Sequence, residues 1–205
     1  MPGIAIPAPT PAPPGSRRAA ILDAALNCFV RRGYSSTTVD DIRRASGASV
    51  GSLYHHFGGK DRIAAALYVD GLADYQRGFQ AVLAEHGDAR SGVEAIVAYH
   101  LQWVDEHADL ARFLLAMRET EVIAAAAPEL HRRNRAFFAA VHAWFARHAE
   151  LPDLPADLLE PLLLGPTQEF VRHWLAGRAT TAPARAQAVL AAAAWRALIT
   201  TEEAP

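Results

Sequence analysis

Residues 33–61, which read GYSSTTVDDIRRASGASVGSLYHHFGGKD, decide the fold of this chain. Thr38 precedes an apolar-periodic segment, and its hydroxyl can cap the backbone amide of Asp41 while that carboxylate reaches back to Thr38. Gly47 suits the end of the helix that begins there. The pattern predicts a short helix that starts at Thr38, stops at Gly47 and buries Val39 and Ile42.

A second short helix is predicted over Val50–His56. Ser49 can cap its first turn, and Gly58-Gly59 breaks the chain after Phe57 has returned to the core. The two helices are joined only by the turn Gly47-Ala48-Ser49. Helices joined by so short a glycine-containing turn are typical of a helix-turn-helix that reads duplex DNA.

The second helix has a polar, small-residue surface that suits contact with DNA. Gly51 and Ser52 allow close approach to base edges, while Tyr54 and His55 can reach phosphates. Lys60, the only lysine of the chain, stands at the start of the next helix and can meet a phosphate. We expect DNA contacts from Thr38, Ser49, Val50, Gly51, Ser52, Tyr54, His55 and Lys60.

Charge is unevenly distributed along the chain. Residues 17–63 carry eight basic and four acidic side chains, whereas the net charge of the whole chain is −2. The segment is therefore net positive by four, and the remainder is net negative by six. This distribution favours binding of a polyanion by the N-terminal third.

Composition limits the other function classes. The segment Met1–Gly15 has six prolines and no charged side chain, which predicts a disordered tail over residues 1–16 rather than a signal peptide. The sequence has no apolar run long enough to span a membrane. Its one cysteine, Cys28, cannot form an internal disulfide, in keeping with a reducing compartment. We expect a cytoplasmic protein.

Apolar residues recur at three and four positions through most of the chain, which predicts an all-α fold. Arg17–Arg32 is expected as a first helix, ended by Gly33. The expected helices beyond the helix-turn-helix are 60–85, 91–107, 109–124, 128–148, 157–176 and 183–199. Pro166 lies inside one of them and should kink it.

These residues resemble the TetR family of one-component transcriptional regulators. The resemblance covers residues 17–63 and rests on Ile21-Leu22-Asp23-Ala24-Ala25, Phe29, Gly33, Thr38-Val39-Asp40-Asp41-Ile42, Gly47-Ala48-Ser49, Gly51-Ser52-Leu53-Tyr54, Phe57 and Lys60. It implies a three-helix DNA-binding domain over 17–63, joined by a long helix to a ligand-binding and dimerisation domain over 64–205. It also implies a homodimer on a pseudo-palindromic operator, most often a repressor released by a small molecule.

Val50 departs from the family pattern, which often has a polar or basic residue at this position. If the helix docks as the family implies, Val50 favours apolar contact with a thymine methyl over a hydrogen bond to guanine. The departure bears on base preference and not on the mode of binding.

The last two predicted helices look like the family's dimerisation elements. Both carry apolar stripes, and the final helix is rich in alanine, which allows close approach of a partner helix. The interface candidates are Thr167, Phe170, Trp174, Leu190, Ala194 and Leu198. The alternative is that both stripes belong to the core of a single chain.

The middle helices carry aromatic and polar residues that suit a mostly apolar pocket with a few directing groups. The candidates are Tyr99, His100, Trp103, Phe113, Met117, Phe138, Trp144, Gln168 and His173. Such a stripe is also common in a simple core. We expect a small hydrophobic or aromatic effector.

The residue pattern does not indicate a metal site, a cofactor site or an enzyme active site. The nine histidines do not have the spacing of a zinc site, and no catalytic constellation or cofactor-binding loop is present. We therefore expect no metal, no cofactor and no enzymatic activity. The competing hypothesis is a helical small-molecule-binding or interaction module that lacks specific DNA binding.

Overall fold

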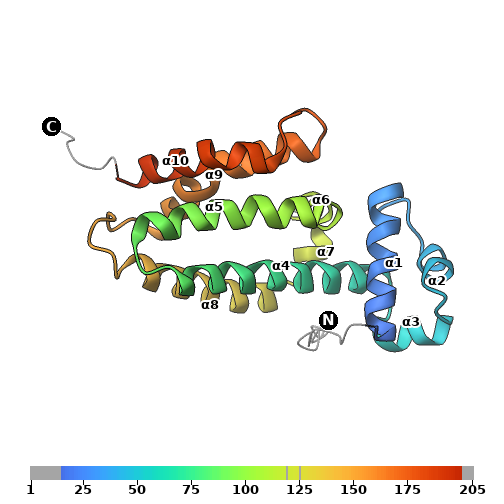
Figure 1. The fold of residues 1–205 in the computed structure, drawn as a ribbon. Coiled ribbons are helices and arrows are strands. Elements are labelled where there is room, and N and C mark those ends of the chain that lie inside the picture. Colours follow the sequence, from blue (N-terminus) through green and yellow to red (C-terminus); the bar gives the residue numbers. More distant parts are fainter. Residues whose placement is uncertain (1–14, 119, 125, 200–205) are drawn as a thin grey trace. The chain divides into compact units, whose positions relative to one another are not determined.

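A computed structural model describes residues 15–118, 120–124 and 126–199, and within these ranges the regular secondary structure is helical throughout (Figure 1). The predicted all-α fold is confirmed. The proline-rich segment 1–14 lies outside the described residues. The helices are α1 Arg17–Arg32, α2 Val39–Ser46, α3 Val50–His56, α4 Lys60–Glu85, α5 Ala89–Glu106, α6 Ala108–Met117, α7 Glu121–Ala124, α8 Ala127–Phe145, α9 Ala156–Leu175 and α10 Pro183–Ile199.

The chain forms two compact units. The first contains the described residues up to Asp74 together with Asp109–Arg133, and the second contains Tyr75–Ala108 and the described residues from Asn134. None of the described helices combines the length and apolar character needed to cross a membrane.

Local capping signals set the ends of the helices in the first unit. Ser16 accepts a hydrogen bond from the Ala19 amide at the start of α1, and Gly33 ends that helix with a φ of 81°. The predicted capping box is present at α2: the Asp41 amide donates to Thr38 Oγ1 at 3.1 Å, and the Thr38 amide donates to Asp41 Oδ2 at 3.0 Å. Gly47 adopts the left-handed conformation at the end of α2.

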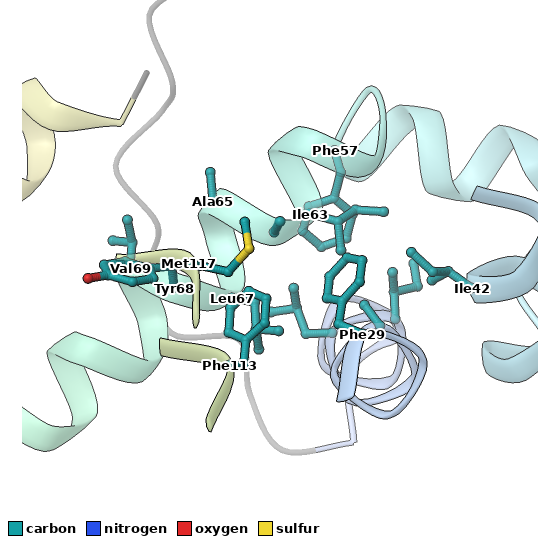
Figure 2. Close-up of a cluster of buried hydrophobic side chains, with 14 of the residues drawn as sticks. Phe29, Ile42, Phe57, Ile63, Ala65, Leu67, Tyr68, Val69, Phe113 and Met117 are labelled. Carbon is teal, nitrogen blue, oxygen red and sulfur yellow. The ribbon is translucent and has the colours of Figure 1, made fainter. Parts of the chain in front are cut away.

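The core of the first unit gathers side chains from α1, α2, α3, α4, α6, α7 and the start of α8. Figure 2 shows Phe29 of α1 and Phe113 of α6 close together, with Ile63 of α4 and Phe57 nearby. Ile42 and Leu53, from the two helices of the helix-turn-helix, are also fully buried in this cluster. The helix-turn-helix is therefore anchored through one apolar residue on each helix.

One predicted helix is wrong in extent. Residues 109–124 do not form one helix, because α6 ends at Met117 and α7 begins at Glu121. The Thr120 hydroxyl donates to the Met117 carbonyl at 2.9 Å, a local bond that competes with continuation of the helix.

The second unit is built on α5, which contacts both α9 and α10 (Figure 1). Trp144 of α8 packs on Gly92 of α5 so closely that a Cβ added at Gly92 would lie 2.3 Å from a ring carbon. The indole nitrogen of Trp144 donates to the His86 carbonyl at 3.2 Å. Gly92 is thus required by close approach. Two prolines, Pro161 and the predicted Pro166, lie inside α9.

Candidate nucleic-acid interface

Helix α3 presents one face to solvent and one to the core. Val50 and Tyr54, one helical turn apart, are 56% and 55% exposed, although both are large and apolar or aromatic. Leu53, on the flank of this face, is buried, and His55 and Gly51 are exposed. An exposed turn of this kind, anchored to the core by a buried leucine, has the form of a recognition helix.

Two of the predicted contact residues already have a structural task. Ser49 Oγ accepts from the Ser52 amide at 3.1 Å and so caps α3. Thr38 Oγ1 both accepts from the Asp41 amide and donates to the Asp41 carboxylate at 2.7 Å. These bonds from Thr38, together with the Arg32 guanidinium, lower the pKa of Asp41. Both hydroxyls fix the starts of the helices, and a contact from either to DNA stays a prediction.

The Lys60 ammonium lies against the turn between α1 and α2. Its Nζ donates to the Tyr34 carbonyl at 3.0 Å and lies 4.4 Å from the centroid of the Tyr34 ring. The Tyr34 hydroxyl in turn donates to the Asp61 carboxylate. Burial and the adjacent Asp61 carboxylate raise the pKa of Tyr34, which keeps this hydroxyl protonated as a donor. Sequence reasoning missed Tyr34, whose partners are distant in the chain.

A second anchor joins the start of α1 to α4. Arg18 Nη1 lies 2.6 Å from Asp70 Oδ2, and both side chains are mostly buried. The same guanidinium lies 5.5 Å from the centroid of the Phe57 ring. Arg18 therefore stabilises the framework around α3, and its charge is matched within the unit. No local signal in the sequence indicates this pair.

Residues 21–67 match the family model described as "Bacterial regulatory proteins, tetR family". This range contains the capped helix pair and the exposed face of α3 described above. Over this range the chain is similar to the TetR family of regulators. The description of that family as regulatory proteins agrees with the expectation that this chain is not an enzyme.

Named relatives share the N-terminal region. This chain is 36% identical over 89 residues to the HTH-type transcriptional repressor KstR2 of Rhodococcus jostii RHA1, which is 43% of this chain and 44% of that protein. It is 41% identical over 54 residues to the HTH-type transcriptional repressor AcnR of Corynebacterium efficiens, 26% of this chain and 29% of that one. The matches span less than half the length of these curated relatives.

Solved structures extend the likeness over nearly the whole chain. A TetR family transcription regulator from Marinobacter aquaeolei VT8 superposes with a TM-score of 0.74 at 22% identity, covering 89% of this chain and 95% of that one. FadR from Bacillus subtilis, solved in complex with stearoyl-CoA, gives 0.73 at 14% identity, covering 90% and 99%. At these identities the likeness shows the shared TetR fold.

The predicted effector residues do not form one group. Phe113 and Met117 are buried in the core of the first unit, whereas Tyr99, His100 and Trp103 lie in the second. Trp144 is occupied by packing on Gly92. Phe113, Met117 and Trp144 are closely packed in these cores, and a contact from any of them to an effector stays a prediction.

The remaining candidates divide into a cluster and a surface set. His100 Nδ1 lies 2.8 Å from the Tyr75 hydroxyl, and the Trp103 and Tyr99 rings lie 5.2 Å and 5.5 Å from the Tyr75 ring, between centroids. Tyr75, absent from the sequence prediction, joins the other three. Burial is the main cause that raises the pKa of Tyr75, followed by the nearby Tyr99 and Glu160.

The surface set is less coherent. Gln168 Nε2 donates to Glu160 Oε1 at 3.1 Å. Both residues lie on α9, and the Glu160 carboxylate helps to raise the pKa of Tyr75. His173 pairs with Glu169 at 2.8 Å on the exposed side of α9. Phe138 is 37% exposed.

The six residues predicted for the dimer interface differ in burial. Phe170, Trp174 and Leu190 are partly exposed, whereas Thr167, Ala194 and Leu198 are buried. The side chains of the buried three are enclosed in the chain's own second unit, and a role in a dimer interface stays a prediction for all six. Val189 is 70% exposed on α10 and was missed.

Proposed function

We propose that this chain is a ligand-responsive transcriptional regulator, a repressor that leaves a palindromic operator when a small hydrophobic or aromatic effector binds. The exposed Val50–Tyr54 face of α3 carries the proposal. If α3 only completed a helical bundle, its large apolar and aromatic side chains would be buried. Val50 and Tyr54 are exposed instead, which suits contact with a partner such as DNA. The relatives KstR2 and AcnR are HTH-type transcriptional repressors, which supports repression.

In this proposal residues 17–63 bind DNA, and residues 64–205 bind the effector and form the dimer. Apolar surface on α9 and α10 suits a second copy of this chain: Phe170, Trp174 and Leu190 are partly exposed, and Val189 is 70% exposed. Two copies present two α3 helices to two half-sites. Such a regulator works on DNA in the cytoplasm.

The proposed switch has two states, with and without effector. The effector changes DNA affinity only if its own affinity differs between these states, and a coupling of about 1–3 kcal/mol is enough. Stearoyl-CoA, the ligand of the FadR structure from Bacillus subtilis, combines a long apolar acyl chain with a charged coenzyme A group. Its acyl chain supports an effector with a large apolar part.

The competing proposal is a small-molecule carrier with no specific DNA binding. Fluorescence-anisotropy titration of the full chain separates the two, using labelled DNA from upstream of its own gene and scrambled DNA of equal length at two salt concentrations. The regulator is expected to prefer the upstream DNA by about a thousandfold or more. Equal and steeply salt-dependent affinity for both DNAs would contradict autoregulation at that site and favour the carrier.

A further inference from the structure

We propose that His100 is the polar recognition point of the effector site, and that it selects an uncharged ring compound carrying a hydroxyl group. The inference rests on the proposed function, because it assumes that the second unit binds a small molecule. It adds the chemical class of that molecule and the residue that distinguishes it.

Only one of the two ring nitrogens of His100 has a hydrogen-bond partner among the described residues. Its Nδ1 pairs with the Tyr75 hydroxyl at 2.8 Å. Its Nε2 is buried and has no hydrogen-bond partner among the described residues. A buried donor or acceptor without a partner is costly, so native proteins rarely leave one. A ligand group that reaches Nε2 removes this cost.

Aromatic side chains pack around Tyr75, the hydrogen-bond partner of His100. The ring centroid of Tyr75 lies 5.6 Å from His100, 5.2 Å from Trp103 and 6.0 Å from Phe79. The Tyr99 hydroxyl donates to the Tyr75 carbonyl at 2.8 Å, which fixes a further ring in this cluster. Flat apolar faces around a single directing polar atom suit a ring system with one polar substituent.

The surroundings of His100 favour an uncharged group. Burial lowers the pKa of His100 to about 4, and desolvation is the single cause of the shift. Among the described residues no carboxylate offsets this effect, so the ring is neutral at pH 7, and a ligand charge beside it would carry the same desolvation cost.

A hydroxyl fits this neutral imidazole better than a group that only donates or only accepts. The Tyr75 bond is compatible with either tautomer of His100, so Nε2 either carries a proton or offers a lone pair. A hydroxyl can serve both cases because it donates and accepts.

The test uses three probes of the same ring system: 1-naphthol, 1-methylnaphthalene and 1-naphthoate. Binding to the full-length protein is followed by tryptophan fluorescence, since Trp103 lies in the cluster. We expect wild type to bind 1-naphthol about five- to tenfold more tightly than 1-methylnaphthalene, the ratio for one buried neutral hydrogen bond, and 1-naphthoate most weakly. His100→Phe is expected to abolish the preference for naphthol.

His142→Phe is the matched control, because its Nε2 is also buried without a partner among the described residues but His142 lies on a different helix, α8. It is expected to keep the wild-type preference. Ring-nitrogen NMR of the wild-type protein provides a second readout: 1-naphthol should shift the Nε2 resonance of His100 and not that of His142. This readout stands even if His100→Phe fails to fold.

Any one of four results would overturn the inference: no binding of naphthol, equal binding of naphthol and methylnaphthalene, tighter binding of naphthoate, or an unmoved His100 Nε2 resonance. The DNA titration separates failure of this inference from failure of the proposed function. Specific operator binding with no discrimination among the probes removes only the role of His100. Selective naphthol binding by a protein without specific DNA binding leaves the inference in place and removes the regulator.

Discussion

The ring of Phe113 stacks on the ring of Phe29, with centroids 5.5 Å apart and planes inclined by 13°. The contact joins α6 to α1, although four helices separate them in sequence. Both side chains are almost fully buried (Figure 2). The helix-turn-helix therefore shares a hydrophobic core with a segment beyond residue 100.

Phe113→Ala should lower the free energy of unfolding by about 3–5 kcal/mol, because it leaves a cavity against Phe29. Urea denaturation measures the loss. The matched control is Phe138→Ala, the same change at a side chain that is 37% exposed, where a loss below about 1 kcal/mol is expected. Similar losses in the two variants would show that the stack contributes little.

Val50→Ala should weaken binding to the preferred operator by about two- to tenfold and leave folding stability unchanged, since Val50 is exposed. The physical reason is a lost apolar contact with a thymine methyl. Replacing the contacted thymine by uracil removes that methyl. In anisotropy titrations uracil should weaken binding of wild type and have no effect on Val50→Ala; an equal effect on both would exclude the contact.

Lys60→Met should weaken binding to all DNA sequences alike and reduce the slope of log affinity against log salt by about one, if the ammonium meets a phosphate while it is held on the Tyr34 carbonyl. Tyr34→Phe is the control, because it keeps the ring and the carbonyl and loses only the bond to Asp61. An unchanged slope in Lys60→Met, with lower stability, would assign Lys60 to fixing the turn alone.

Stability should fall as the pH drops from about 6.5 to about 4. The pKa of His100 is lowered to about 4 in the folded chain, so in this window the unfolded chain takes up a proton that the folded chain does not. The contribution of neutral His100 to the free energy of unfolding is fully present above about pH 6.5, and about 3 kcal/mol of it is lost by pH 4. Urea titrations at pH 7 and 4.5 should show a smaller decrease for His100→Phe than for wild type.

The sequence predicted the ends of α1, α3 and α10 correctly, and placed Thr38 and Gly47 at the two ends of α2. These ends depend on residues within a few positions of one another, such as Thr38 with Asp41, so the signal is local. The break between α6 and α7 was missed because a threonine bond to a nearby carbonyl leaves no periodic pattern.

The chemistry of the second unit could be predicted only in part. His100 and Trp103 were identified by residue type, but Tyr75, which joins them, lies on a different helix. Likewise, an alanine-rich stripe does not reveal whether α5 of the same chain or a second copy covers it. Ala194 and Leu198 are covered within their own chain.

The packing of Trp144 on Gly92 imposes an order on sequence change in this protein. Any larger residue at position 92 would collide with an indole held in place by the His86 carbonyl, so that substitution becomes acceptable only after position 144 has become smaller. That order passes through a cavity, which is destabilising but still folded, whereas the reverse order passes through the collision. Homologous lineages that replaced Trp144 by a smaller residue are therefore the ones in which a side chain at position 92 should have appeared.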